Sequence, residues 1–176
     1  GLFARIHPMK DHTTFLHAAK ILIDINPDVR FICAGGVHDE HSTLAIALKS
    51  CANKLGLDSH ILWLGARKDP ERLMGACDIT TLTSDNGEGF PNAVAESMAC
   101  GVPCVVTDIG DASNIVADFS EVVPPNNPQA LAIAWKSALD KSVIEQSRKT
   151  MQMRQSIVDR FTSSAIAKRN LDILLK

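Results

Sequence analysis

Two glutamates enclose a glycine-rich stretch in the middle of the chain, and together they could bind hydroxyl groups. Glu88 and Glu96 are separated by seven residues. A carboxylate accepts two hydrogen bonds in one plane, which suits the vicinal hydroxyls of a ribose or a hexose. The alternative is that Glu96 only complements a helix dipole and that Glu88 is a solvated loop charge.

The residues between the two glutamates are typical of a helix start that binds phosphate. Pro91 fits the first turn of a helix, where its missing N–H is not needed. The unpaired N–H groups of Asn92 and Ala93, together with the positive end of the helix dipole, attract anions. Phosphate donors between two hydroxyl acceptors predict a nucleotide-sugar site.

Two cations near the start of the chain could neutralise the same phosphates, Arg5 as a flat fork and Lys10 as a point charge. The alternative is an arginine at a strand end and a solvated lysine at a helix start. His7 lies between them, and we interpret it as part of the loop structure. The chain has no Asp-x-Asp pair and no histidines at i, i+4 spacing, so we expect no metal at this site.

Strands and helices alternate along the chain. Runs of apolar and β-branched residues predict strands at residues 2–6, 29–34, 61–64, 78–83, 102–107 and 121–123. Apolar periodicity with start and stop residues predicts helices at 11–25, 41–55, 70–77, 91–101, 112–117, 128–139, 142–161 and 162–175. This alternation predicts an α/β fold, a single domain over residues 1–176. We expect a doubly wound, Rossmann-like parallel sheet of about six strands with helices on both faces.

In such a sheet, ligands bind beyond the carboxyl ends of the strands. Every segment singled out so far leaves such an end, as do the neighbouring glycine-rich loops. We therefore expect one crevice rimmed by residues 5–10, 35–36, 65–68, 88–92 and 107–111.

Composition excludes several classes of function. A net charge of −2 and a pI near 6.3 give no electrostatic case for nucleic-acid binding. No apolar run approaches the length of a membrane span. Five cysteines without paired metal spacing indicate a reducing cytoplasm, and Cys100 and Cys104 are predicted to be buried free thiols. Basic residues in the last helices could face a membrane, but intervening acidic residues favour a solvated helix face.

Five motifs, in order, resemble the C-terminal donor-binding domain of retaining glycosyltransferases of family four, the group 1 type with the GT-B fold. They cover residues 4–11, 64–67, 77–79, 84–101 and 102–108. The resemblance runs from the first residue to about Pro125 and continues more loosely through the final helices. Ala4 stands where the family commonly has a glycine.

The resemblance implies a role for each site residue. Arg5 and Lys10 match the pair that neutralises the donor diphosphate, and Glu88 matches the glutamate that holds and positions the donor sugar. We expect these three to be the catalytic residues, acting without a metal on a UDP-sugar or a GDP-sugar. The further donor-binding residues are the base loop Gly65, Ala66 and Arg67, the sugar-binding backbone at Gly89 and Phe90, the helix start Pro91, Asn92 and Ala93, and Glu96, which binds the ribose.

The resemblance therefore implies the donor-binding half of a hexosyltransferase of polysaccharide or glycolipid synthesis. The family's enzymes carry an N-terminal domain that binds the acceptor. Because a buried strand begins at once here, we expect this chain to lack that domain and not to transfer sugar alone. We expect the complete protein to be cytoplasmic and to associate peripherally with the inner face of the membrane.

Two other functions remain open. The first is a stand-alone, non-catalytic module or partner subunit that binds a nucleotide sugar. The second is a flavodoxin-like regulator, which would bind phosphate or flavin rather than UDP or GDP.

Overall fold

The structure is a computed structural model that describes residues 1–140 and 143–175. Within these residues, the strands form one six-stranded sheet in the order β3-β2-β1-β4-β5-β6, and every neighbouring pair is parallel. The strands are β1 (Leu2–Phe3), β2 (Phe31–Ala34), β3 (Ile61–Gly65), β4 (Thr80–Leu82), β5 (Cys104–Thr107) and β6 (Val122–Val123). The predicted fold class is confirmed, and the order is that of a dinucleotide-binding sheet and differs from the flavodoxin-like one.

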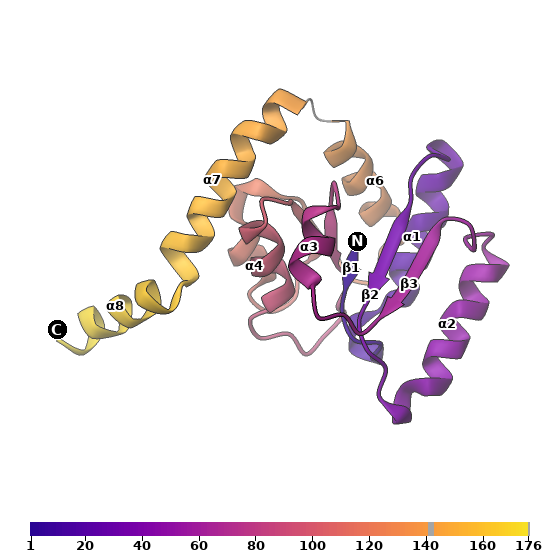
Figure 1. Cartoon of the computed structure of the whole chain (residues 1–176), viewed down its shortest axis with the longest axis horizontal. Coiled ribbons are helices and arrows are strands. Elements are labelled where there is room, and N and C mark those ends of the chain that lie inside the picture. The colour runs from indigo at the N-terminus through magenta and orange to yellow at the C-terminus, as the bar shows by residue number, and fades with distance from the viewer. Residues whose placement is uncertain (141–142, 176) are drawn as a thin grey trace.

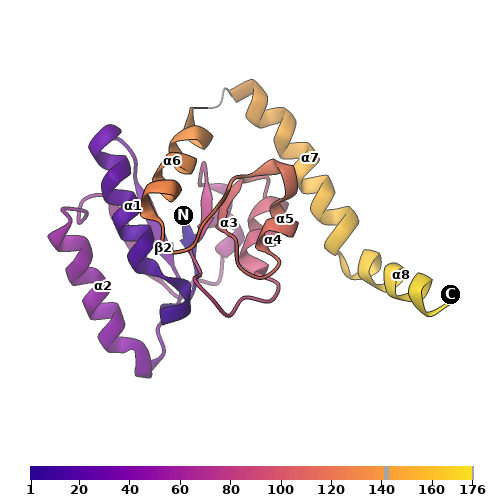
Figure 2. The ribbon, with the colours of Figure 1, turned by 180° about the vertical axis from the view of Figure 1, so that it is seen from behind.

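Helices cover both faces of this sheet (Figure 1, Figure 2). One face packs against α1 (His12–Ile25), α2 (Ser42–Lys54) and α6 (Pro128–Leu139). The other packs against α4 (Asn92–Ala99), α5 (Ala112–Val116) and α7 (Val143–Phe161), with α3 (Pro70–Gly75) beside α4. Short 3-10 turns at Pro8–Lys10, Asp39–His41 and Ala117–Phe119 connect them.

The two apolar cores follow from the alternation of side chains along each strand. In β5, Val105 belongs to the core under α1 and α6, whereas Cys104 and Val106 belong to the core under α4 and α5. Trp135 of α6 packs against the rings of Phe15 and Phe31, at centroid distances of 5.2 and 5.6 Å. The strands are therefore held rigidly from both sides, which fixes the positions of the loops at their ends.

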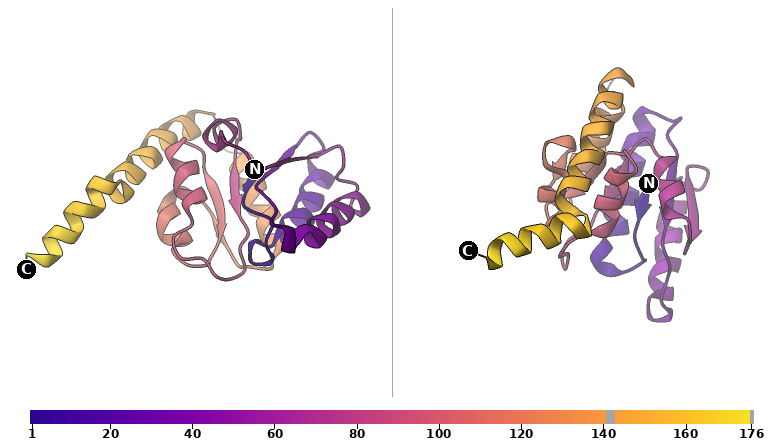
Figure 3. Two further views of the ribbon diagram at one scale, coloured as in Figure 1. Left: turned by 60° about the horizontal axis from the view of Figure 1, so that its bottom comes forward. Right: turned by 60° about the vertical axis from the view of Figure 1, so that its left-hand side comes forward.

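The last helix, α8 (Ser163–Leu174), continues from the end of α7 and extends away from the sheet (Figure 3). Thr162 caps its first turn. None of the helices in the described residues is long and apolar enough to cross a bilayer.

Several predicted boundaries are wrong. The first strand ends at Phe3 rather than at residue 6, and its pairing continues irregularly through the N–H of Ala4, which donates to Ala34 O at 3.0 Å. This close approach needs Gly35, because a Cβ there would overlap the carbonyl of Ala4. Pro91 is the N-cap of α4 rather than its first helical residue, since its backbone is extended, with ψ of 95°. The predicted helix start at 142 lies outside the described residues.

The cysteines are free, as expected, but they differ in exposure. Cys104 is buried, whereas Cys100, which was also predicted to be buried, is half-buried. Burial raises the pKa of the Cys104 thiol to about 12, which makes this thiol a poor nucleophile.

Candidate functional site

A cavity of about 250 Å³ opens at the carboxyl ends of β1, β2 and β3, beside the start of α4. Five of the predicted site residues line it, namely Arg5, Ala66, Arg67, Ala93 and Glu96. Two other cavities, of about 270 and 550 Å³, open at the amino ends of the strands and contain none of the predicted site residues. The order of the strands therefore brings residues from distant parts of the chain to one cavity.

Glycines that allow segments of backbone to approach each other closely line this cavity. Gly35 and Gly36, which follow β2, both line it. Gly36 lies next to Ala66, because a Cβ on Gly36 would be 3.5 Å from the Ala66 Cβ. Gly65 ends β3 with φ of +62°, a conformation that favours glycine and turns the chain toward the cavity.

The two arginines of the cavity have partners of their own, which the sequence did not indicate. Nη1 of Arg5 lies 3.2 Å from Nε2 of His38. Arg67 donates two hydrogen bonds of 2.9 Å to Asp69, one to each carboxylate oxygen. The pKa of Asp69 lies below its usual value because of this bidentate contact. Both guanidinium groups are exposed at the cavity and are oriented by a neighbour.

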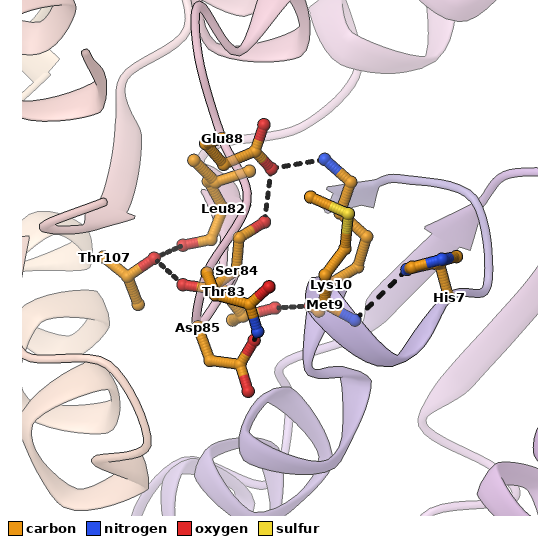
Figure 4. A network of polar contacts seen from close by, with 10 residues as sticks. His7, Met9, Lys10, Leu82, Thr83, Ser84, Asp85, Glu88 and Thr107 are labelled. Carbon is orange, nitrogen blue, oxygen red and sulfur yellow. Dashed lines mark hydrogen bonds and ion pairs between the residues drawn. The ribbon is translucent and has the colours of Figure 1, made fainter. Parts of the chain in front are cut away.

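Lys10 and Glu88, which follow the neighbouring strands β1 and β4, form an ion pair across 78 positions of sequence (Figure 4). The hydroxyl of Ser84 donates to the same Glu88 oxygen at 2.5 Å. The side chains of Lys10 and Glu88 are only 17% and 8% exposed. Glu88 is therefore not a solvated loop charge, and Lys10 is not a solvated lysine. A carboxylate this buried needs such compensation from a cation and a hydroxyl.

Hydrogen bonds fix the loop that carries Glu88 to the segment that carries Lys10. The N–H of Asp85 donates to Met9 O at 3.1 Å, and the hydroxyl of Thr83 donates to Lys10 O at 2.7 Å. From the other side, Thr107 at the end of β5 donates to Ser84 O at 2.6 Å (Figure 4). These hydrogen bonds therefore fix the positions of Lys10 and Glu88 relative to each other.

His7 has the structural position that was predicted for it. Its Nδ1 accepts a hydrogen bond from the N–H of Met9 at 3.2 Å, which caps the 3-10 turn Pro8–Lys10. This contact shapes the backbone next to Lys10. Among the described residues, no group of three or more histidine, cysteine or acidic side chains is arranged to hold a metal ion.

The start of α4 presents backbone donors beside the cavity. The first helical hydrogen bond runs from Val94 N–H to Pro91 O at 3.0 Å, and no side chain of the described residues caps the first turn. Asn92 is exposed and Ala93 is half-buried. Glu96, one turn further along, is exposed and lines the cavity.

Gly89 and Phe90 lie in the loop before α4, outside the lining of the cavity. Gly89 O accepts a hydrogen bond of 2.9 Å from the N–H of Asp111. The ring of Phe90 is 39% exposed and contacts the ring of Phe161. Phe161 was not predicted, and Ser84 and Gly110 were predicted only as members of the segments 84–101 and 107–111, with no role of their own.

The class of protein follows from this arrangement and from comparison with known families. A family model described as glycosyl transferases group 1 matches residues 2–156 of the chain. The chain therefore belongs to this family, and its fold is that of one GT-B domain. Membership excludes the alternative of a flavodoxin-like regulator.

Individual relatives are similar to different extents. The lipopolysaccharide core biosynthesis mannosyltransferase LpsB of Rhizobium meliloti is 32% identical over 121 residues, which cover 69% of this chain and 34% of LpsB. The structure of HepE of Anabaena in complex with UDP and glucose is 26% identical, with a TM-score of 0.86 over 99% of this chain and 47% of that chain. A C-terminal domain of a group 1 glycosyl transferase from Francisella tularensis, 24% identical with a TM-score of 0.73, shares the fold. The chain thus spans between a third and a half of LpsB and HepE.

Proposed function

We propose that this chain binds the donor of a retaining glycosyltransferase, which moves a hexose from a UDP-sugar or a GDP-sugar to an acceptor in polysaccharide or glycolipid synthesis. The observation that carries the proposal is the cavity that unites Arg5, Arg67 and Glu96 at the start of α4, with the Lys10–Glu88 pair at the same edge of the sheet. The complex of HepE with UDP and glucose supports it, as does the name of LpsB.

The cavity is proposed to hold the nucleotide. The loop of Gly65, Ala66 and Arg67 contacts the base, and the exposed carboxylate of Glu96 accepts hydrogen bonds from the ribose hydroxyls. The diphosphate lies against the N–H groups of Asn92 and Ala93, which the helix dipole of α4 makes attractive to anions.

The sugar is proposed to lie toward Glu88. Its carboxylate accepts hydrogen bonds from sugar hydroxyls, beside the backbone of Gly89 and Phe90. Ser84 and Lys10 hold Glu88 in a single orientation. Glu88 therefore positions the sugar and does not act as a covalent nucleophile.

Catalysis is proposed to be electrostatic. Cleavage of the anomeric C–O bond leaves its electron pair, and so negative charge, on the departing diphosphate. Arg5 and Lys10 stabilise that charge more in the transition state than in the bound donor, without a metal ion. The acceptor hydroxyl attacks from the face of the leaving group, which retains the configuration, and its proton passes to an oxygen of the departing diphosphate.

The complete enzyme is proposed to contain a second domain that binds the acceptor. The chain spans 34% of LpsB and 47% of HepE, which leaves room for such a domain in a protein of their length. On this proposal the chain alone binds donor but does not transfer sugar. The complete enzyme works at the cytoplasmic face of the membrane, with which it associates peripherally.

Calorimetric titration of the chain with UDP, GDP, UDP-glucose and GDP-mannose tests donor binding. We expect one nucleotide and its sugar ester to bind, and no binding of any of the four would refute the proposal. In the complete enzyme, Glu88→Ala and Lys10→Ala should each abolish transfer while the protein still folds. Lys20→Ala, which removes an exposed lysine paired with Asp24, is the matched control. Wild-type turnover in Glu88→Ala or Lys10→Ala would refute the catalytic roles. Donor binding by the complete wild-type protein without any transfer would favour the non-catalytic module.

A further inference from the structure

Phe161, the last residue of α7, contacts the loop that carries Gly89 and Phe90. The centroids of the Phe90 and Phe161 rings are 5.1 Å apart, with an angle of 60° between the ring planes. Phe161 is also half-buried against the apolar cluster under α4 and α5. It lies beyond the segment that matches the family, which ends at residue 156. An aromatic pair of this geometry contributes more than its buried area alone.

Arg160 fixes Phe161 in place and connects it to the same loop by a second route. Its guanidinium lies 4.5 Å from the centre of the Phe161 ring, a favourable cation–π contact. Nη2 donates to the backbone oxygen of Asn114 at 2.6 Å and to its Oδ1 at 3.0 Å, while Nη1 lies 3.4 Å from Ile115 O. Arg160 therefore binds the carboxyl end of α5.

The amino end of α5 holds the loop in turn. The N–H of Asp111, the residue before α5, donates to Gly89 O at 2.9 Å, and Ile115 N–H donates to Asp111 O at 2.9 Å. Two sets of contacts thus connect the end of α7 to the loop. The first is the direct contact between the rings of Phe161 and Phe90, and the second runs from Arg160 through α5 to Gly89.

The following helix restrains the same point. Arg169 of α8 donates from Nη2 to the backbone oxygen of Arg160 at 3.2 Å. The end of α7 is therefore held by α5 on one side and by α8 on the other. Contact with the Phe161 ring therefore restricts Phe90, which is 39% exposed.

We propose that Phe161, supported by Arg160, is a positioning residue that holds the backbone of Gly89 and Phe90 where the donor sugar binds. This inference rests on the proposed function, which assigns that backbone to the sugar. The ring of Phe90 is an anchor for the loop, and the sugar contacts the backbone beside it. Phe161 acts on the sugar and not on the nucleotide, because the nucleotide cavity has none of these residues in its lining.

Amide hydrogen exchange of the chain tests the first half of the proposal without any ligand. Phe161→Ala should speed exchange in residues 85–90, whereas the amides of α1 keep their rates. Phe119→Ala is the matched control, because Phe119 packs against the same apolar cluster from the 3-10 turn that follows α5. Equal exchange of residues 85–90 in Phe161→Ala and Phe119→Ala would overturn the proposal.

Titration with UDP and UDP-glucose, or with GDP and GDP-mannose if the wild type prefers guanine, tests the second half. Phe161→Ala and Phe161→Leu should weaken binding of the nucleotide sugar about fivefold and leave binding of the free nucleotide within about twofold. Phe161→Tyr keeps the ring and should restore wild-type affinity. If Phe161 had only a structural role, Phe161→Leu and Phe161→Tyr would both keep most of the packing and most of the melting temperature. They would then not differ in their affinity for the nucleotide sugar.

The outcomes separate this inference from the proposed function. If the wild-type chain binds none of UDP, GDP, UDP-glucose and GDP-mannose, donor binding is refuted, and the role of Phe161 in positioning the sugar is refuted too. The hydrogen-exchange rates still decide whether Phe161 orders the loop at residues 85–90. A wild type that binds the nucleotide sugar, with Phe161→Ala unchanged in its affinity, overturns the inference alone.

Discussion

Gly110 packs directly against the backbone of Glu88. A Cβ on Gly110 would lie 2.7 Å from Gly89 O and closer still to Glu88 O, and Gly110 has φ of +60°. The loop after β5 therefore packs against the loop after β4 at Glu88 and Gly89, two of the three residues assigned to the donor sugar. Only glycine allows both the backbone conformation and the close approach.

Gly110→Ala should lower the free energy of unfolding by about 2 kcal/mol, because it adds a steric overlap to the strain of a positive φ. It should also weaken binding of the nucleotide sugar. Gly56→Ala is the matched control, since Gly56 has φ of +71° but nothing within 4 Å of its Cβ position. Urea unfolding and calorimetric titration give the two quantities. If both variants lose the same stability, the contact with Glu88 contributes nothing.

The Lys10–Glu88 pair should contribute to stability, unlike an exposed ion pair. Lys10→Met leaves a carboxylate that is 8% exposed without its cation, and should lower the free energy of unfolding by about 2 kcal/mol. The double variant Lys10→Met/Glu88→Gln should recover part of this loss, because no unpaired charge remains. Lys20→Met breaks the exposed Lys20–Asp24 pair and should change stability by less than about 0.5 kcal/mol. Strict additivity of the Lys10 and Glu88 variants would contradict the coupling.

The two glutamates should affect different parts of the donor. Glu96 lines the nucleotide cavity, so Glu96→Ala should weaken binding of the free nucleotide and of the nucleotide sugar equally, by about tenfold. Glu88→Ala should weaken binding of the nucleotide sugar only. Glu71→Ala, at an exposed position of α3, is the control. A loss of free-nucleotide affinity in Glu88→Ala that matches the loss in Glu96→Ala would contradict the separate assignments.

His12, at the start of α1, should make stability depend on pH. Burial lowers the pKa of His12 from its usual 6.5 to about 4, with Asp11 opposing the shift and Lys10 adding to it. The folded-state pKa is depressed, so between pH 4 and 6.5 the unfolded chain binds more protons than the folded one. Stability contributed by neutral His12 is therefore complete above about pH 6.5 and is lost as the pH falls toward 4, by about 3 kcal/mol in all.

Urea unfolding between pH 4 and 7 measures this dependence. His12→Leu should flatten it, because no proton can then bind at this buried position. His17→Asn, at an exposed position of the same helix, should leave the wild-type slope unchanged. An unchanged slope in His12→Leu would show that other groups produce the dependence.

Much of the fold was predictable because the signals for it are local. The β-branched run before Ser84, the proline at position 91 and the glycine at 101 define a strand, a loop and a helix without reference to the rest of the chain. Boundaries were less predictable. The first strand ends early and Pro91 is an N-cap, because Gly35 meets the Ala4 carbonyl and the loop before α4 reaches the helix in an extended conformation.

The candidate site was predictable as a set of loops and less so as a set of contacts. Parallel strands place all their carboxyl ends at one edge, so Arg5 and Arg67 could be assigned to one crevice from their order alone, whereas Glu96 was assigned from its spacing to Glu88 and from the family resemblance. The sequence did not indicate which residues these side chains contact. The pairing of Arg67 with Asp69 and the approach of His38 to Arg5 depend on how each loop folds back.

The residue types and their order along the chain already determine the α/β architecture, the glycine loops and the residues at the strand ends, because periodicity and turn chemistry act over a few residues. Packing decides which of these residues meet. Lys10 and Glu88 form a buried pair only because β1 and β4 are neighbours in the sheet, and Phe161 reaches Phe90 only because α7 packs across α4 and α5. Such contacts join residues tens of positions apart, and their geometry is set by the twist and layering of the whole domain.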